Sequence, residues 1–199
     1  MEKRTYWYVK RFLDILISLI LIILTLPVIL LVLLITLINI GTPLIDIRIP
    51  RLGRNRKPFY MYKIRTRVYD KDFNSSYTKI SKIIDKLGLN ELVQLFNVLK
   101  GDMSIVGPRP FIKDEKLPEG KISDKRYLVR PGITGLATVN GGIYLSHKKK
   151  LEYDEIYYDN FGFLQDLKII VKTPFAFIRQ IKDRWFVWDL EIIKMLKEL

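Results

Sequence analysis

The chain has no cysteine and a single histidine, and both features exclude kinds of chemistry. Without cysteine there is no disulfide, no thiolate metal site and no cysteine nucleophile. His147 lies in a basic run, residues 146–150, where a solvated side chain does not favour a catalytic role. Ser-His-Asp triads and histidine-rich metal sites are therefore not expected.

Charged residues are also missing from one long stretch, although the chain as a whole is strongly basic. Its 199 residues, enough for one domain with a core, carry a formal net charge of +13. Such a charge suits an anionic partner: nucleic acid, anionic lipid or a phosphorylated substrate. A hydrophobic fraction of 49% is high for a nucleic-acid binder. Charge and apolarity together favour anionic lipid at a membrane surface, with no nucleic-acid partner.

The uncharged stretch covers residues 15–45, which is long enough to cross a membrane. Pro27 interrupts it, and each half, residues 15–26 and 28–40, would be roughly 18–20 Å long at 1.5 Å per residue. Neither half can cross a hydrocarbon core of ~30 Å. Thr25 could bond a carbonyl that the proline releases. A signal peptide is not expected, because the stretch is too long and no small-residue cleavage site follows.

Basic residues flank the stretch on both sides, so they cannot orient a single pass. They are Lys3, Arg4, Lys10 and Arg11 before it, and Arg48, Arg51, Arg54, Arg56 and Lys57 after it. A re-entrant hairpin that enters and leaves by the cytoplasmic face satisfies both flanks. A plain spanning helix is the alternative.

The rest of the chain reads as a small, mostly helical body. Residues 58–64 form a short β-rich run, and Ile80, Ile83, Ile84 and Leu87 have helical spacing up to Gly88. Asn90 and Glu91 are good residues to open the next helix, which is also their ordinary structural interpretation. The predicted fold is α+β and mostly helical, with a membrane-embedded broken helix in residues 1–45 and a cytoplasmic domain in residues 46–199. Its amphipathic interfacial helices would include the C-terminal aromatics Trp185, Phe186 and Trp188, which could equally pack against the core.

Four cations lie in motif-like or Pro/Gly-framed segments and are candidates for binding phosphate: Lys63, Arg65, Arg109 and Arg130. Guanidinium groups grip phosphate oxygens bidentately, and phosphoryl transfer needs its charge neutralised in this way.

Several long motifs occur in a fixed order. They are Lys-Arg-x-x-Asp at residues 10–14, Lys-Ile-Arg-Thr at 63–66, the Asn-Glu to Gly-Pro-Arg-Pro segment at 89–110, and Val-Arg-Pro-Gly-Ile-Thr-Gly at 129–135. Together they resemble the bacterial sugar transferases, the monotopic phosphoglycosyl transferases. The resemblance extends from residue 10 to about residue 173.

The resemblance implies an activity. An aspartate of an Asp-Glu pair attacks the β-phosphate of a nucleotide sugar, with UDP expected as the carrier, and polyprenyl phosphate then accepts the phosphosugar. Mg²⁺ would balance charge, with Glu91 and Asp102 as its candidate ligands. The expected location is the cytoplasmic face of the bacterial inner membrane, in exopolysaccharide or other surface glycan assembly, with other assembly proteins as possible partners.

The departures from the family pattern surround that chemistry. Asn90 replaces the nucleophile, Asp85 replaces an arginine, and Gly88, Thr138 and Gly142 replace other motif residues. Glu91 or Asp102 could attack instead. Asp85 is about 140° from Asn90 around a continuous helix, so only a break at Gly88 would bring the two together. Two hypotheses stay open: an active transferase, and a degenerate relative that binds substrate or regulates a partner without turnover.

Overall fold

The computed structural model describes residues 3–69, 74–113 and 124–197, with side chains from Thr5 to Asp183. Within these residues the chain is mostly helical, as the sequence predicts. The helices are α1 (Lys3–Asn39), α2 (Lys79–Lys86), α3 (Gln94–Lys100), α4 (Leu136–Val139), α5 (His147–Asp159) and α6 (Phe163–Lys197). The C-terminal aromatics Trp185, Phe186 and Trp188 belong to α6, and their side chains lie outside the described residues.

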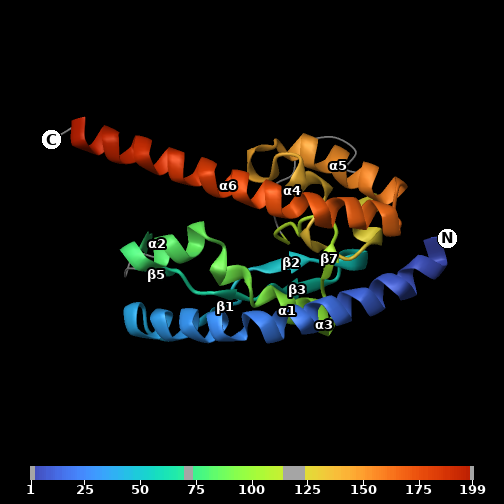
Figure 1. Cartoon of the computed structure of the whole chain (residues 1–199), viewed down its shortest axis with the longest axis horizontal. Helices are drawn as coiled ribbons and strands as arrows, with labels where there is room; N and C mark the ends of the chain where they lie inside the picture. The colour runs from blue at the N-terminus through green and yellow to red at the C-terminus, as the bar shows by residue number, and fades with distance from the viewer. Residues whose placement is uncertain (1–2, 70–73, 114–123, 198–199) are drawn as a thin grey trace.

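Short strands form four separate pairs. Three pairs are antiparallel: β1 (Ile45–Asp46) with β4 (Lys63–Ile64), β2 (Pro50–Leu52) with β3 (Pro58–Tyr60), and β5 (Arg67–Tyr69) with β6 (Ser75–Tyr77). One pair is parallel, β7 (Ser104–Val106) with β8 (Gly132–Thr134). In Figure 1 the two long helices α1 and α6 lie on opposite sides of the molecule, with strands between them, and α3 lies against α1.

The N-terminal helix α1 differs from the expectation in one respect. It continues through Pro27 as a single element, so the predicted division into two separate halves is wrong. Thr25 does donate a hydrogen bond to a carbonyl, but that carbonyl belongs to Leu21, at 2.7 Å. The carbonyl that Pro27 leaves without its N–H donor is four residues before it, at Ile23. The predicted role of Thr25 is therefore also wrong.

One side of α1 is buried along the body of the protein for almost its full length. The buried side chains are Tyr6, Lys10, Asp14, Ser18, Ile22, Ile29, Val32 and Thr36. The other side is apolar and exposed, and α1 is the one helix of the described chain that is long and apolar enough to cross a membrane. Only 17% of its most apolar window is buried.

The Lys-Arg-x-x-Asp motif attaches α1 to the body. Lys10 forms a buried ion pair with Asp166 at the start of α6, at 2.5 Å. The Arg11 guanidinium donates to two last-turn carbonyls of α3, at 2.6 and 2.7 Å. Asp14 accepts from the Ser104 hydroxyl and from the next backbone N–H, both at 2.9 Å. The motif is therefore structural, joining three elements that are distant in the sequence.

The parallel pair β7–β8 brings two glycine-containing motifs into backbone contact. The Gly107 N–H donates to the Thr134 carbonyl at 2.9 Å. A Cβ at Gly132 would lie 2.1 Å from the Gly107 nitrogen, and one at Gly135 would lie 2.1 Å from the Gly107 oxygen. Only glycine permits this approach, so these glycines are required by packing.

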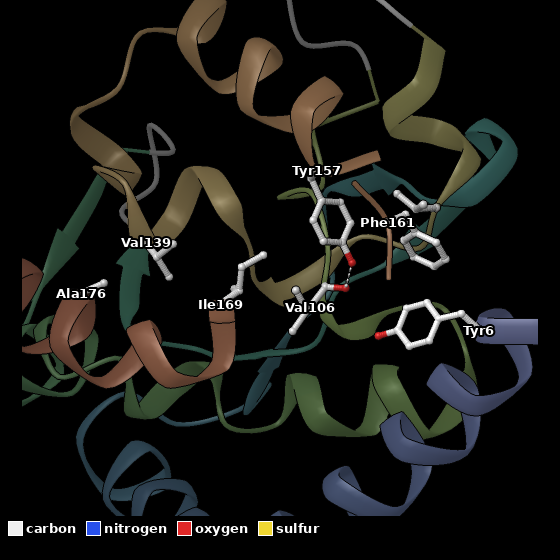
Figure 2. Packing of buried hydrophobic residues seen from close by; sticks show 8 residues of the cluster. Tyr6, Val106, Val139, Tyr157, Phe161, Ile169 and Ala176 are labelled. Atoms are coloured by element: carbon white, nitrogen blue, oxygen red, sulfur yellow. Dashed lines mark hydrogen bonds between the residues drawn. The ribbon is translucent and has the colours of Figure 1, made fainter. Parts of the chain in front are cut away.

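The largest core cluster joins the first turns of α1 to β7, α4, α5 and α6. Figure 2 shows Tyr157 and Phe161 near Tyr6, with the Tyr157 hydroxyl directed at β7. That hydroxyl donates to Asp166 Oδ1 at 2.8 Å and lies 3.1 Å from the Val106 carbonyl oxygen. The core therefore fixes both α1 and α6 around β7.

Candidate functional site

The segment from Asp85 to Glu91 changes direction at a glycine. The predicted helix ends as expected: α2 stops at Lys86, and Gly88 adopts a left-handed conformation with φ of 67°. A 3₁₀ turn over Leu89–Glu91 follows, and α3 begins at Gln94. Asn90 does not cap that helix, since its side chain points elsewhere, so the prediction of an ordinary N-cap is wrong.

The break at Gly88 brings Asp85 and Asn90 together. The Asn90 amide donates from Nδ2 to Asp85 Oδ1 at 2.7 Å. The angle of 140° between them applies to a continuous helix, and the left-handed glycine removes that continuity. The expectation that Asp85 lies on another face is therefore wrong, and Asn90, the residue that the resemblance aligns with the nucleophile, adjoins a carboxylate.

Further donors surround the Asp85 carboxylate. Lys63 Nζ lies 3.3 Å from Oδ1, the Tyr77 hydroxyl lies 3.1 Å from Oδ2, and the Thr66 hydroxyl lies 3.4 Å from Oδ1. Burial alone would raise the pKa of Asp85, but the Lys63 charge and the hydrogen bonds from Asn90, Lys63 and Tyr77 outweigh it and lower the pKa. Asp85 is therefore ionised at neutral pH.

Lys63 also joins this carboxylate to the second acid of the motif. Its Nζ lies 3.4 Å from Glu91 Oε1, so one ammonium contacts both Asp85 and Glu91. The three side chains are each about one-third exposed, at 34%, 27% and 37% for Lys63, Asp85 and Glu91. Solvent or a ligand can thus reach them. The Asp85 cluster is defined here as Lys63, Thr66, Tyr77, Asp85, Asn90 and Glu91.

Asn90 itself is fully buried and only half satisfied. Its residue exposure is 0%, and its Oδ1 has no hydrogen-bond partner among the described residues. An unpaired buried acceptor costs about 1–3 kcal/mol. The buried amide oxygen thus has an unused acceptor capacity, and a neutral amide does not act as a carboxylate nucleophile.

The two predicted metal ligands lie apart. Glu91 precedes α3 and Asp102 follows it, so the seven-residue helix, ~10 Å long, separates them. Asp102 is instead 3.1 Å from Lys100. No group of three or more His, Asp or Glu side chains that could hold a metal occurs in the described part of the chain. In this structure Glu91 and Asp102 thus belong to different surroundings, and their role as ligands of one Mg²⁺ stays a prediction.

The predicted phosphate-binding cations are distributed over several places. Lys63 belongs to the Asp85 cluster, and Arg65 follows it by two residues. Arg65, however, donates from Nη2 to the carbonyls of Ile40 and Gly41, at 2.9 and 2.7 Å. It closes the C-terminal end of α1, where a cation is electrostatically favoured. Lys63 alone of the four is seen in contact with the Asp85 cluster.

Arg109 lines a different, small pocket of about 50 Å³. Two departures from the family pattern, Thr138 and Gly142, line the same pocket, together with Gln180 from α6. A Cβ at Gly142 would lie 2.7 Å from Gln180 Nε2, which donates to the Thr138 carbonyl at 3.1 Å. Gln180 thus occupies the space into which a larger residue at position 142 would extend.

Arg130 belongs to a third, basic pocket of about 340 Å³, which it lines with Arg11, Arg54, Trp7 and Tyr8. Burial and the nearby guanidinium groups of Arg11 and Arg54 lower the pKa of Arg130. Arg130 donates from Nε to the Gly101 carbonyl at 2.9 Å. Among the described residues, the lining of this pocket contains three arginines and no acidic residue. Such a pocket is suited to bind an anionic group.

Two members of the Asp85 cluster were not identified from the sequence. Thr66 ends the Lys-Ile-Arg-Thr motif, so motif position could have suggested it. Tyr77 lies in β6, beyond a polar segment, and no sequence signal connects it to Asp85. Tyr77 precedes α2 by two residues, and its hydroxyl reaches Asp85 in the last turn of that helix at 3.1 Å.

The comparison with known proteins agrees with these motifs. The sequence model of the family described as "Bacterial sugar transferase" matches residues 5–180. EpsL of Bacillus subtilis, named an uncharacterized sugar transferase, is 38% identical over 172 residues, which are 83% of this chain and 85% of that protein.

Two longer relatives carry names that state an activity. The undecaprenyl-phosphate galactose phosphotransferase of Salmonella typhimurium is 32% identical over 90% of this chain and 42% of its own length. The UDP-glucose:undecaprenyl-phosphate glucose-1-phosphate transferase of Klebsiella pneumoniae is 35% identical over 83% of this chain and 39% of its own. The chain thus spans less than half of either longer protein. With the family model covering most of its length, the chain belongs to the bacterial sugar transferase family.

Proposed function

We propose that this protein transfers a sugar phosphate from a UDP-sugar to a polyprenyl phosphate at a membrane surface, in surface glycan assembly. The observation that carries the proposal is the Asp85 cluster, in which two carboxylates share one lysine at the family's active-site motif. The names of the Salmonella and Klebsiella relatives supply the substrate classes, a nucleotide sugar and undecaprenyl phosphate.

The cluster has the parts that phosphoryl transfer requires. A carboxylate can form an acyl phosphate as a covalent intermediate. Lys63 offers positive charge beside that carboxylate, where the negative charge of a diphosphate has to be neutralised. Partial exposure of Lys63, Asp85 and Glu91 leaves room for a substrate to approach.

The same residues fit Mg²⁺ that arrives with the diphosphate. Mg²⁺ usually keeps several waters and binds through one or two carboxylates together with substrate phosphates. Glu91 supplies a partly exposed carboxylate, and the Asp85 carboxylate, which shares Lys63 with it, is a second partly exposed oxygen donor. Bound there, the metal would neutralise charge on the phosphates.

The attachment of α1 supports a monotopic association with the cytoplasmic face of the membrane. Both ends of α1 are tied to the body, through Lys10 to Asp166 at one end and through Arg65 to the last carbonyls at the other. A helix crossing a bilayer would carry the body and its charged residues into hydrocarbon, which is costly. With its exposed apolar side in one leaflet, α1 keeps both of its ends on the same side of the membrane, which is the monotopic arrangement without a hairpin break.

A second function is favoured by one observation, the neutral amide at position 90. Asn90 is buried and cannot serve as the family's nucleophile. A protein that binds the nucleotide sugar or the lipid phosphate without turnover, as a regulatory partner of an active transferase, would keep the fold and the cations.

Release of UMP distinguishes the two functions. The purified protein in detergent is incubated with Mg²⁺, undecaprenyl phosphate and, in turn, UDP-glucose, UDP-galactose, UDP-N-acetylglucosamine and UDP-N-acetylgalactosamine. UMP release that depends on the lipid phosphate supports transfer. Saturable binding of a UDP-sugar without UMP release supports the second function.

A further inference from the structure

Position 90 lacks the carboxylate that the family mechanism needs, and a carboxylate lies one hydrogen bond away. We infer that Asp85 is the catalytic nucleophile of this protein, attacking the β-phosphorus of the nucleotide sugar in place of the residue at position 90. The inference rests on the proposed function and assigns its reacting group. Three structural observations carry it.

The first observation is the position of Asp85. Gly88 folds the chain back so that Asp85 Oδ1 lies 2.7 Å from Asn90 Nδ2, the atom that occupies the place of a carboxylate oxygen of the family's aspartate. The Asp85 side chain is 27% exposed, whereas Asn90 is fully buried. Asp85 is therefore both adjacent to the expected reacting position and reachable by a substrate.

The second observation is the orientation of the carboxylate. Asn90 and Thr66 lie at Oδ1, and the Tyr77 hydroxyl lies at Oδ2. These contacts fix the plane of the carboxylate before substrate arrives, which is what a positioned nucleophile requires. When one oxygen bonds to phosphorus, a donor to the other oxygen remains to stabilise the acyl carbonyl.

The third observation concerns the other acids. Glu91 occupies the same motif position as the family's glutamate, so it keeps its own role and does not replace the missing aspartate. Asp102 lies beyond α3 and pairs with Lys100. Asp85 is thus the acid in direct contact with both Asn90 and Lys63 that no other role accounts for.

The reaction balances without a further reactant. An Asp85 oxygen forms a bond to the β-phosphorus, and the bond from that phosphorus to the oxygen bridging to the α-phosphate breaks. UMP leaves with the electron pair, and the phosphosugar remains as an acyl phosphate on Asp85. An oxygen of polyprenyl phosphate then bonds to the same phosphorus, and the bond to Asp85 breaks, which returns the carboxylate and yields the polyprenyl diphosphate sugar.

The direct test maps the covalent intermediate in the unmodified protein. The protein is mixed with the same four UDP-sugars and Mg²⁺ without lipid acceptor, quenched with hydroxylamine, digested and analysed by mass spectrometry. Hydroxylamine converts an acyl phosphate to a hydroxamate at the residue that carried it. The expected hydroxamate is at Asp85. A hydroxamate at Glu91 or elsewhere overturns the inference while the proposed function stands, and no adduct together with no UMP release overturns both.

Variants test the same inference through turnover. Asp85→Asn keeps the size of the side chain and should lower UMP release by at least about a thousand-fold. Asp159→Asn, at an exposed ion pair with Lys125, is the matched control and should retain release. Combining Asp85→Asn with Asn90→Asp returns a carboxylate to the family position, and recovered release shows that the single variant lost its nucleophile and kept its fold. Undiminished release by Asp85→Asn overturns the inference.

Discussion

Replacement of the buried amide at position 90 by an acid tests the geometry of the Asp85 cluster directly. In the structure Asn90 Nδ2 lies 2.7 Å from Asp85 Oδ1. In Asn90→Asp a carboxylate oxygen takes the place of that nitrogen. A donor becomes an acceptor, so a hydrogen bond is replaced by the repulsion of two carboxylates. The variant therefore should be less stable than the native protein wherever both groups are ionised.

The size of the effect follows from Coulomb's law. Two unit charges about 4 Å apart repel by about 4 kcal/mol at an effective dielectric constant of 20. Lys63, 3.3 Å from Asp85, offsets part of this, which leaves a loss of about 2–3 kcal/mol. For a chain of this length that corresponds to a fall in Tm of roughly 4–12 °C.

The effect should depend on pH with a definite sign. Two adjacent carboxylates hold one proton between them, so the pKa of the pair is raised above the unfolded values. The folded state of Asn90→Asp then binds more protons than its unfolded state. The stability of the variant therefore falls as pH rises through that raised pKa. Near pH 4 the shared proton donates in place of the amide, and the difference from native should nearly vanish.

Thermal unfolding in detergent, followed by tryptophan fluorescence at pH 4, 6 and 8, measures this. EDTA is present so that no metal screens the two acids. Asn140→Asp, at an exposed asparagine after α4, is the control and should show no such pH dependence. Equal stability of native protein and Asn90→Asp at pH 8 would refute the proximity of Asp85 to position 90.

Three further predictions concern the scaffold, each measured by thermal unfolding. Gly132→Ala should not fold, because its Cβ would lie 2.1 Å from a backbone nitrogen, whereas Gly162→Ala should be tolerated at a contact of 3.8 Å; a stable Gly132→Ala protein would contradict the backbone contact. Arg11→Met should lower stability by about 1.5–3 kcal/mol, since it leaves two α3 carbonyls without their charged donor; no loss would mean that this contact is not formed. Burial raises the pKa of Asp154 to about 6 despite its arginine partner, so native stability should fall as pH rises from about 4 to 6, and Asp154→Asn should flatten that slope; an unchanged slope would assign it to another group.

Much of the fold could be predicted because its signals are local. Helical spacing predicted α2. Gly88 was expected to end that helix, and in the structure α2 ends at Lys86 and Gly88 is left-handed. The long apolar run predicted a membrane-embedded helix in residues 1–45, and α1 is a long helix apolar enough to enter a membrane. The continuity of α1 through Pro27 was not predicted, because the packing of residues on both sides of the proline against the body outweighs the loss of one backbone hydrogen bond.

The cluster could be predicted only in part, because its geometry is not local. Lys63 and Glu91 were identified from motifs, and the structure places them in contact at 3.4 Å. Arg65 was named as a phosphate ligand on the same basis, yet its guanidinium is used at the end of α1. A motif indicates that a residue belongs near a site, but the partner that satisfies its charge depends on which element the fold brings next to it.

The exchange of charges at positions 85 and 90 is best understood as a pair. By the resemblance, the family pattern has a cation at 85 and an acid at 90, whereas this chain has an acid at 85 and a neutral amide at 90. Were Asp85 only a remnant of drift, a buried amide and a carboxylate would have no reason to share a hydrogen bond of 2.7 Å beside a lysine that also holds Glu91. With Asp85 as the nucleophile, the arrangement has one acid to react, one acid to assist and Lys63 between them.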